Sequence, residues 1–339
     1  MKDNIYDVAI IGAGPAGCAA ALYGHAKGLN VCVIGEPPNQ GKFISILGSE
    51  SVHPGLDSLF KLLNFNLTLG NISNGYYDGI WVNDFYSELG REGKDSWRGY
   101  HLNKERLVQE MFKEIQRRDI CIVPDFAVDL IKTDNKIMHV QTKGNIIIRA
   151  KNILDCSGNK RFATRKLEIQ RKFYSPSLTC WSSKTESIPE EIHESLRTSL
   201  VIRKNSWEWL APEFNRACTW TQLIDYKKNK FSPPEVFSNY SNKTKISVYN
   251  MRWSISRPLF SLDVLLCGDA GAIVDPASGQ GIFFAMYSAI MATHVVLRSF
   301  ESPEQKKYFF EEYDQWFLDH CERKIFELRN IYLSNGFEW

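Results

Sequence analysis

The motif Gly12-Ala13-Gly14-Pro15-Ala16-Gly17 is the feature that most constrains the fold of this chain. An apolar run at residues 5–11 precedes it, an alanine-rich segment at 16–28 follows it, and a second apolar run covers 29–34. A strand, a glycine turn, a helix and a second strand in this order form the right-handed crossover from which parallel sheets are built. The sequence therefore predicts the α/β class, with a Rossmann-type domain at the N-terminus.

Each glycine of this motif has its own physical reason in a dinucleotide-binding turn. Gly12 allows the tight turn, Gly14 lets the backbone approach a pyrophosphate, and Gly17 permits close packing of the helix on the strand. Pro15 and Ala16 open the helix, whose N-terminus then faces the phosphates.

A dinucleotide site of this kind also uses an acid that binds the ribose, about twenty residues beyond the glycines. Glu36 stands at that distance. Its register stays open, because Gly35 can equally be the last residue of the second strand.

A second candidate site lies near the other end of the chain. An apolar run at 262–267 ends beside an acid, and a glycine-rich turn then leads into a helix. Its residues are Gly268, Asp269, Pro276, Gly279, Gln280 and Gly281. Backbone N–H groups at such a helix N-terminus suit electron-rich ring oxygens. Taken alone, the segment fits better a plain helix start with a capping acid.

The remaining chain predicts three regions. A discontinuous Rossmann-type cofactor-binding domain covers 1–172 and 254–300, an antiparallel-sheet substrate lobe covers 173–253, and a C-terminal helical segment covers 301–339. Residues 37–55 are predicted as a loop. Further helices are expected at 103–118, 281–300 and 303–332, and strands at 120–123, 128–133, 138–142, 145–149 and 153–155.

Composition excludes several function classes. The 41 Lys and Arg residues nearly balance the 39 Asp and Glu residues, so we expect neither nucleic acid nor an anionic membrane as partner. No apolar run reaches the length of a membrane span. The 8 cysteines are scattered singly, without a CxxC pair or a metal-ligand cluster, which predicts reduced thiols, no metal site and a cytoplasmic protein.

Together the two ends of the chain resemble the FAD-dependent monooxygenase superfamily, which includes aromatic hydroxylases, tryptophan halogenases and geranylgeranyl reductases. The resemblance covers nearly the whole chain and implies FAD as cofactor. It implies that the first glycine motif holds the pyrophosphate, that Asp269 holds the ribityl and diphosphate region, and that the turn from Pro276 to Gly281 lies against the isoalloxazine.

Three further residues or motifs match this superfamily less directly. Ser157 and Gly158, in Asp155-Cys156-Ser157-Gly158, match a middle cofactor motif. Val128 corresponds to a backbone contact with adenine. Lys104 stands where relatives commonly place an arginine that reaches the phosphates; the charge is kept but the bidentate fork is lost.

The substrate side resembles a narrower group. The stretch from Ser49 to Pro54 resembles both halogenases and flavoproteins that modify tryptophan during maturation of quinone cofactors. The box from Trp207 to Pro212 resembles a halogenase box, and its Ala-Pro ending is closer to the quinone-cofactor group. Glu50 and His53 are candidate acid or base groups, although a solvated loop histidine is an alternative for His53. Trp207 and Trp209, with Tyr76 and Trp81, are expected to line an aromatic pocket; ordinary core packing is equally compatible with the tryptophans.

We therefore expect an FAD-dependent monooxygenase that hydroxylates an aromatic ring, with a tryptophan in a precursor protein as favoured substrate, in tryptophylquinone cofactor biogenesis. The lysine by which halogenases handle the halogenating species has no counterpart in residues 74–85, so halogenation is disfavoured. A flavin-dependent reductase of prenyl chains and a non-enzymatic, chaperone-like flavoprotein are the alternatives. The electron donor stays open, because no second glycine motif follows a strand.

Overall fold

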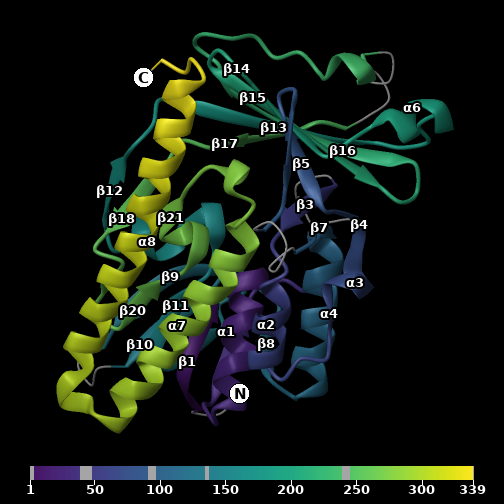
Figure 1. Cartoon of the computed structure of the whole chain (residues 1–339). Helices are drawn as coiled ribbons and strands as arrows, with labels where there is room; N and C mark the ends of the chain where they lie inside the picture. Colours follow the sequence, from purple (N-terminus) through teal and green to yellow (C-terminus); the bar gives the residue numbers. More distant parts are fainter. Residues whose placement is uncertain (1–3, 39–47, 91–96, 134–136, 239–244, 339) are drawn as a thin grey trace.

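The computed structural model describes residues 4–38, 48–90, 97–133, 137–238 and 245–338. Its largest sheet has eight strands and contains a parallel core in which both ends of the chain meet (Figure 1). The order of the parallel strands is β20 (Val264–Leu266), β11 (Ile147–Asp155), β1 (Ile5–Ile11), β2 (Val31–Ile34) and β8 (Cys121–Val123). This arrangement confirms the predicted α/β class with a Rossmann-type domain.

Three antiparallel strands complete this sheet. β10 (Met138–Thr142) pairs with β11 and with β9 (Ala127–Lys132), and β19 (Phe260–Ser261) pairs with β20. The strands predicted separately at 145–149 and 153–155 are one continuous strand, β11. The intervening Lys151 is exposed at a position where the strand alternates between buried and exposed side chains, so it does not interrupt the strand.

Four long helices cover one face of this sheet (Figure 1). α1 (Pro15–Ala26) packs on α4 (Lys104–Arg117) and on α7 (Gly281–Glu301), and α7 packs on α8 (Lys306–Ser334). α7 is long and apolar enough to cross a membrane by length and composition. Because it lies between α1 and α8, we interpret it as a core helix.

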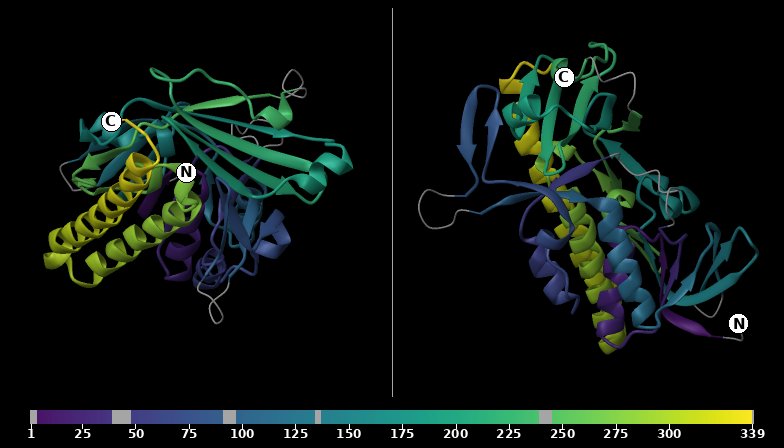
Figure 2. Two further views of the ribbon diagram at one scale, coloured as in Figure 1. Left: turned by 45° about the horizontal axis from the view of Figure 1, so that its top comes forward. Right: turned by 90° about the vertical axis from the view of Figure 1, so that its right-hand side faces the viewer.

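The second large sheet has seven strands, most of them from residues 173–253. Its order is β17 (Ser247–Asn250), β13 (Leu178–Thr185), β16 (Ala217–Asp225), β15 (Ser206–Glu213), β14 (Ser199–Arg203), β5 (Gly79–Val82) and β6 (Phe85–Glu88). The hairpin β5–β6 comes from outside the range 173–253, and β5 pairs in parallel with β14. In the right-hand view of Figure 2 this blue hairpin stands out from the body of the molecule.

Two small sheets connect the large ones. One consists of β3 (Ser49–Val52), β7 (Gly99–Asn103) and β4 (Ser73–Tyr77), and the other of β12 (Gln170–Phe173), β18 (Ser254–Arg257) and β21 (Ala272–Ile273). Residues 49–52 were predicted within a loop; they form a strand because β7 supplies their backbone partners. The short helices are α2 (Leu56–Leu62), α3 (Leu69–Ile72), α5 (Phe162–Lys166) and α6 (Glu190–Ser195).

Candidate functional site

The glycine motif forms the turn between β1 and α1, and its glycines differ in what surrounds them. A Cβ atom on Gly12, whose φ is +111°, would lie 2.4 Å from the carbonyl oxygen of Cys156. A Cβ on Gly17 would lie 1.9 Å from the Gly12 oxygen. A Cβ on Gly14 would meet no atom within 4 Å. Gly12 and Gly17 are thus required by packing, whereas Gly14 faces open space that a ligand can approach.

The N-terminus of α1 is suited to an anion. Gly14 is its N-cap and supplies no side-chain cap, and Pro15 occupies the first turn. The first backbone N–H groups of a helix have no partner within the helix, and they carry its positive dipole end. This terminus can therefore hold a pyrophosphate.

The second predicted segment arrives beside this turn. Gly268 follows β20 with a φ of +54°, and a Cβ there would lie 3.1 Å from the Cβ of Ala285 in α7 and 3.9 Å from the Cβ of Ala16 in α1. The Gly268 N–H donates to the Ser288 hydroxyl at 2.9 Å. The structure thus brings the two ends of the chain together at the carboxyl edge of the parallel sheet, where α/β proteins bind their ligands.

Charged side chains gather around Asp269. Lys104, at the start of α4, lies 3.0 Å from the carboxylate of Glu50 in β3. The neighbouring carboxylate raises the pKa of Lys104. Asp269 has an exposed surface, but the surrounding protein atoms desolvate its carboxylate and raise its pKa. Glu50 adds to this rise, and the cations Lys104 and Arg171 oppose it. Glu50 therefore partners a cation in this region, which restricts its use as a free base.

The turn before α7 lies against β3. Asp275 is buried, and its carboxylate accepts from the Ala277 N–H at 2.8 Å and from the Trp253 indole at 3.2 Å. Burial raises the pKa of Asp275 to about 6. A Cβ on Gly279, whose φ is +60°, would lie 3.4 Å from the carbonyl oxygen of Ser51, and a Cβ on Gly281 would meet no atom within 4 Å. The hydrogen bonds of buried Asp275 fix the turn, and the N-terminus of α7 stays accessible.

These features fit an extended dinucleotide such as FAD. The α1 N-terminus can hold its diphosphate, and the open N-terminus of α7, from Gln280 to Gly281, can face the flavin ring oxygens. Contacts of Asp269 and Lys104 with the rest of the cofactor stay predictions.

Other predicted cofactor residues are placed as follows. Glu36 is exposed just beyond β2, and Gly158 has a φ of +60° with open space at its Cβ position. The Ser157 hydroxyl accepts from the Phe162 N–H at the start of α5 at 2.9 Å. Val128 is exposed in β9. The roles of these four residues stay predictions.

His53 is exposed at the end of β3 and packs on Trp97, with 4.3 Å between ring centroids. Its Nδ1 lies 2.9 Å from the Gly55 N–H and accepts from it. The neutral ring must then carry its proton on Nε2. Because partial burial lowers the pKa of His53, the ring is neutral at physiological pH and offers a hydrogen-bond donor there.

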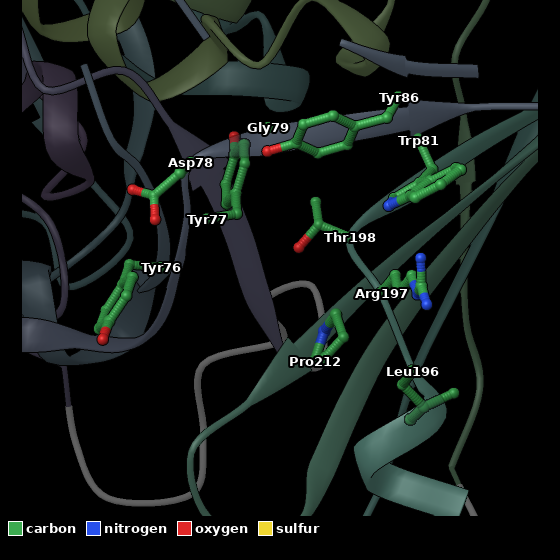
Figure 3. Close-up of a pocket in the computed structure, with 10 residues that line it drawn as sticks. All are labelled: Tyr76, Tyr77, Asp78, Gly79, Trp81, Tyr86, Leu196, Arg197, Thr198 and Pro212. Carbon is green, nitrogen blue, oxygen red and sulfur yellow. The ribbon is translucent and has the colours of Figure 1, made fainter. Parts of the chain in front are cut away.

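A pocket of about 300 Å³ opens beside β4, β5 and the segment before β14 (Figure 3). Tyr76 and Trp81, both predicted, line it together. Trp209 lies behind it, with its ring 6.1 Å from that of Tyr77. Trp207 is buried in the main core and does not line this pocket. The remaining lining residues are Asp78, Gly79, Tyr86, Leu196, Arg197, Thr198 and Pro212.

The sequence analysis missed a polar cluster behind this pocket. His101, in β7, is wholly buried; its Nδ1 lies 3.1 Å from the Ser51 hydroxyl and its Nε2 lies 3.0 Å from the Thr198 hydroxyl. Burial lowers the pKa of His101 to about 3. A histidine in a short strand directly before a helix was the available signal, but its partners come from distant segments.

His101 should make folding stability depend on pH. Its pKa is about 3 in the folded protein against 6.5 for a free side chain, so below pH 6.5 only the unfolded chain takes up the proton. The free energy of unfolding should therefore fall as the pH drops, by about 2 kcal/mol between about pH 7 and pH 5 from this residue alone. Urea unfolding of the wild type and of His101→Gln should show a flatter pH dependence in the variant. His25→Gln, on the exposed end of α1, is the matched control and should keep the wild-type slope.

All eight cysteines are free thiols, as predicted. Within the described ranges, no group of three His, Cys, Asp or Glu residues is placed to hold a metal ion.

Comparison with known proteins places this geometry in a family. Residues 7–164 match the family of FAD dependent oxidoreductases, and residues 91–328 match the tryptophan halogenase family. A chlorinase of pyrrole-2-carbonyl peptidyl-carrier protein from Pseudomonas fluorescens is 22% identical over 93% of this chain and 80% of its own length. A digeranylgeranylglycerophospholipid reductase from Methanosphaerula palustris is 24% identical over 91% of this chain and 81% of its own.

Solved structures share the fold. A flavin-dependent brominase superposes with a TM-score of 0.79 at 17% identity, covering 98% of this chain and 88% of its own. A probable FAD-dependent monooxygenase from Pseudomonas aeruginosa superposes with a TM-score of 0.78 at 12% identity, covering 98% of this chain and 97% of its own. The tryptophan halogenase match spans well over half of the chain. The chain therefore belongs to the tryptophan halogenase family of flavin-dependent oxidoreductases, and its cofactor is FAD.

Proposed function

We propose that this protein is an FAD-dependent monooxygenase that hydroxylates an aromatic ring, and that its substrate is a tryptophan held in a partner protein. The observation that carries the proposal is the pocket beside β5, which combines an aromatic lining with a polar rim and opens next to exposed aromatic residues.

The size and lining of the pocket suit one aromatic ring system. A volume of about 300 Å³ lies at the small end of ligand pockets. The rings of Tyr77, Trp81 and Tyr86 offer faces and edges for stacking on an indole. At the rim, Arg197 lies over the Trp81 ring at 4.8 Å and Asp78 is exposed. A prenyl chain would instead need a long apolar tunnel, and this polar lining does not favour one.

Bound FAD supplies the oxygen-transfer chemistry, and the chain supplies position and proton handling. Glu50 and Lys104 lie on the cofactor side of β3, while the Ser51 hydroxyl lies on the side of His101. In the proposed arrangement β3 is the wall between the pocket and the cofactor turn, where a Cβ on Gly279 would lie 3.4 Å from the Ser51 carbonyl oxygen. Holding the aromatic ring against that wall would orient the reacting carbon and exclude water.

Two considerations support a protein-borne substrate. By its name, the chlorinase relative acts on a pyrrole ring carried by a protein, and so does a brominase relative from Pseudoalteromonas luteoviolacea. Near the pocket, Phe85 is 79% exposed and Tyr86 is 49% exposed. Exposed aromatic side chains of this size are typical of protein contact sites. The quinone-cofactor setting expected from the sequence belongs to this proposal.

Co-expression tests the proposal directly. Candidate precursor proteins are produced with and without this chain, and their tryptophan peptides are measured by mass spectrometry in the presence of ¹⁸O-labelled oxygen. We expect one tryptophan to gain an oxygen atom from O₂ only when this chain is present. A Gly14→Val chain, which should lack FAD, is the matched control. Unmodified precursors together with fast reduction of a prenyl lipid would replace this proposal with the reductase.

Halogenation is the second candidate, because the family match and two relatives point to it. None of the residues that line the described pocket is a lysine. We therefore expect no chlorinated or brominated product from free tryptophan or from the precursor when reduced FAD, O₂ and halide are supplied. Mass spectrometry with mixed bromide isotopes detects such a product as a doublet, and its appearance would assign this chain to halogenation.

A further inference from the structure

Two cysteines lie side by side on neighbouring strands of the parallel sheet. Cys32 in β2 and Cys121 in β8 are strand partners, and their sulfur atoms lie 3.6 Å apart. The two residues are 89 positions apart in the chain, so the pairing of β2 with β8 brings them together. Both are free thiols in the structure. The fold therefore holds two reduced thiols in contact.

The geometry of this pair suits a disulfide. Neighbouring strands lie about 4.7–4.9 Å apart, which is within the Cα separation of about 4.4–6.8 Å that a disulfide bridges. To form the bond, the sulfur atoms must move from 3.6 Å to about 2.05 Å, an approach of about 1.5 Å. Rotation of the two side chains between rotamers supplies movements of this size. The bond can therefore form while β2 and β8 keep their register.

The two thiols differ in reactivity. The Cys32 thiol donates a hydrogen bond to the Cys121 sulfur, and the Tyr6 hydroxyl donates to the same sulfur at 3.1 Å. The bond from Cys32, helped by the bond from Tyr6, lowers the pKa of Cys121 against the opposing effect of burial. The bond that Cys32 donates, together with burial, raises the pKa of Cys32. Because the thiolate is the nucleophile, Cys121 is the reactive member of the pair.

Access to solvent favours the same order. Cys121 is partly exposed, whereas Cys32 is fully buried beside it. The other cysteines of the chain are all buried as well. Thiolate character and exposure together decide which cysteine an oxidant attacks. Oxidation should therefore begin at Cys121.

We propose that Cys32 and Cys121 form a redox-modification site, at which hydrogen peroxide converts the two thiols into a disulfide that joins β2 to β8. Cys121 attacks the peroxide, and Cys32 completes the bond. Both cysteines lie toward the amino ends of their strands, whereas the glycine motif follows the carboxyl end of β1. The site is thus separate from the candidate cofactor site, and its modification is reversible.

The reaction balances in atoms and electrons. The Cys121 thiolate attacks one peroxide oxygen and the O–O bond breaks; the released hydroxide takes up a proton to give water, and Cys121 becomes a sulfenic acid. The Cys32 sulfur then attacks the Cys121 sulfur, the S–O bond breaks, and the hydroxyl group leaves with the Cys32 proton as a second water. The two thiols lose two electrons and two protons, and one hydrogen peroxide is reduced to two water molecules.

Peptide mass spectrometry of the native, FAD-loaded protein tests the site. The protein is treated with hydrogen peroxide, and the remaining thiols are then alkylated under denaturing conditions. Wild type should give a peptide pair joined through Cys32 and Cys121, about two mass units lighter than the two reduced peptides together. Dithiothreitol should restore both thiols by exchange. The inference is overturned if both cysteines remain available for alkylation, or if the disulfide joins Cys121 to another cysteine.

Variants test the order of the two steps. Cys32→Ala should stop at a sulfenic acid on Cys121, which dimedone traps. Cys121→Ala should oxidise Cys32 at least about 10-fold more slowly than wild type, because the buried thiol lacks thiolate character. Cys18→Ala is the matched control and should form the disulfide at the wild-type rate, because Cys18 is fully buried and burial raises its pKa to about 12.

Equal oxidation of Cys32 in wild type and in Cys121→Ala would reject Cys121 as the attacking group. A missing dimedone adduct in Cys32→Ala would reject the sulfenic acid step. These measurements need folded protein and peroxide but no substrate, so their failure is distinguishable from a failure of the proposed function.

Discussion

Gly14→Val should fold normally and lose FAD. No atom lies within 4 Å of a Cβ at Gly14, and its φ of −81° and ψ of −172° are extended backbone that valine adopts. The folding stability of the apoprotein should therefore change by less than about 1 kcal/mol. The added side chain would stand where a pyrophosphate approaches the backbone, so FAD affinity should fall at least about 100-fold, or about 2.7 kcal/mol.

The measurement is the ratio of flavin to protein after purification, followed by calorimetric titration with FAD. Gly70→Val is the matched control. Gly70 is exposed in α3, and a Cβ there would meet only the Thr68 hydroxyl, at 3.9 Å, so this variant should keep FAD. Gly12→Val should give no folded protein, because its Cβ would overlap the Cys156 carbonyl. Stoichiometric FAD in Gly14→Val would show that the phosphates do not approach at this turn.

Local patterns explain why the cofactor side could be predicted. The motif from Gly12 to Gly17 lies between a strand and a helix that are adjacent in sequence, so its geometry follows from a short stretch of chain. The C-terminal turn was ambiguous by itself. It gained meaning from the resemblance, and in the structure Gly268 lies between α1 and α7.

Non-local pairing explains what the sequence analysis missed. β3 has the polar composition of a loop, and its partner β7 lies about fifty residues further along the chain. The hairpin β5–β6 joins the seven-stranded sheet through β14, more than a hundred residues away. The position of His101 before a helix could not reveal its partners, because Ser51 lies in β3 and Thr198 lies just before β14.

The tryptophan box shows the same limit within one strand. Trp207 and Trp209 are two residues apart in β15 and therefore share a face. That face is turned toward the main core, where Trp207 is 1% exposed, while Trp209 reaches the ring of Tyr77. Alternation predicts the shared face, but which tryptophan lies near the pocket depends on where β4 packs. Trp207 is thus a core residue, whereas Trp209 packs on the core and contacts a ring that lines the pocket; a catalytic role for either tryptophan stays a prediction.

Phe85→Ser should weaken the reaction with a protein substrate and spare the reaction with free tryptophan. Phe85 is 79% exposed in the hairpin β5–β6, and it does not line the pocket. Its neighbour Tyr86 does line the pocket, and the Tyr86 ring lies 5.5 Å from that of Trp81. A partner protein that inserts a tryptophan into the pocket would therefore cover Phe85, whereas a free amino acid would not reach it.

Aromatic residues at the centre of a protein interface commonly contribute about 2 kcal/mol or more, so KM for the precursor should rise about 30-fold in Phe85→Ser. The kcat for the precursor, the slow turnover of free tryptophan and the FAD content should stay at wild-type values, because the reacting groups are untouched. Phe326→Ser removes a phenylalanine that is 67% exposed on α8, and it controls for the loss of surface hydrophobicity. Equal KM values in the two variants would place the docking surface elsewhere. Equal kcat/KM for free tryptophan and for the precursor in the wild type would remove the reason for a partner, since remote contacts would then contribute nothing to positioning the ring.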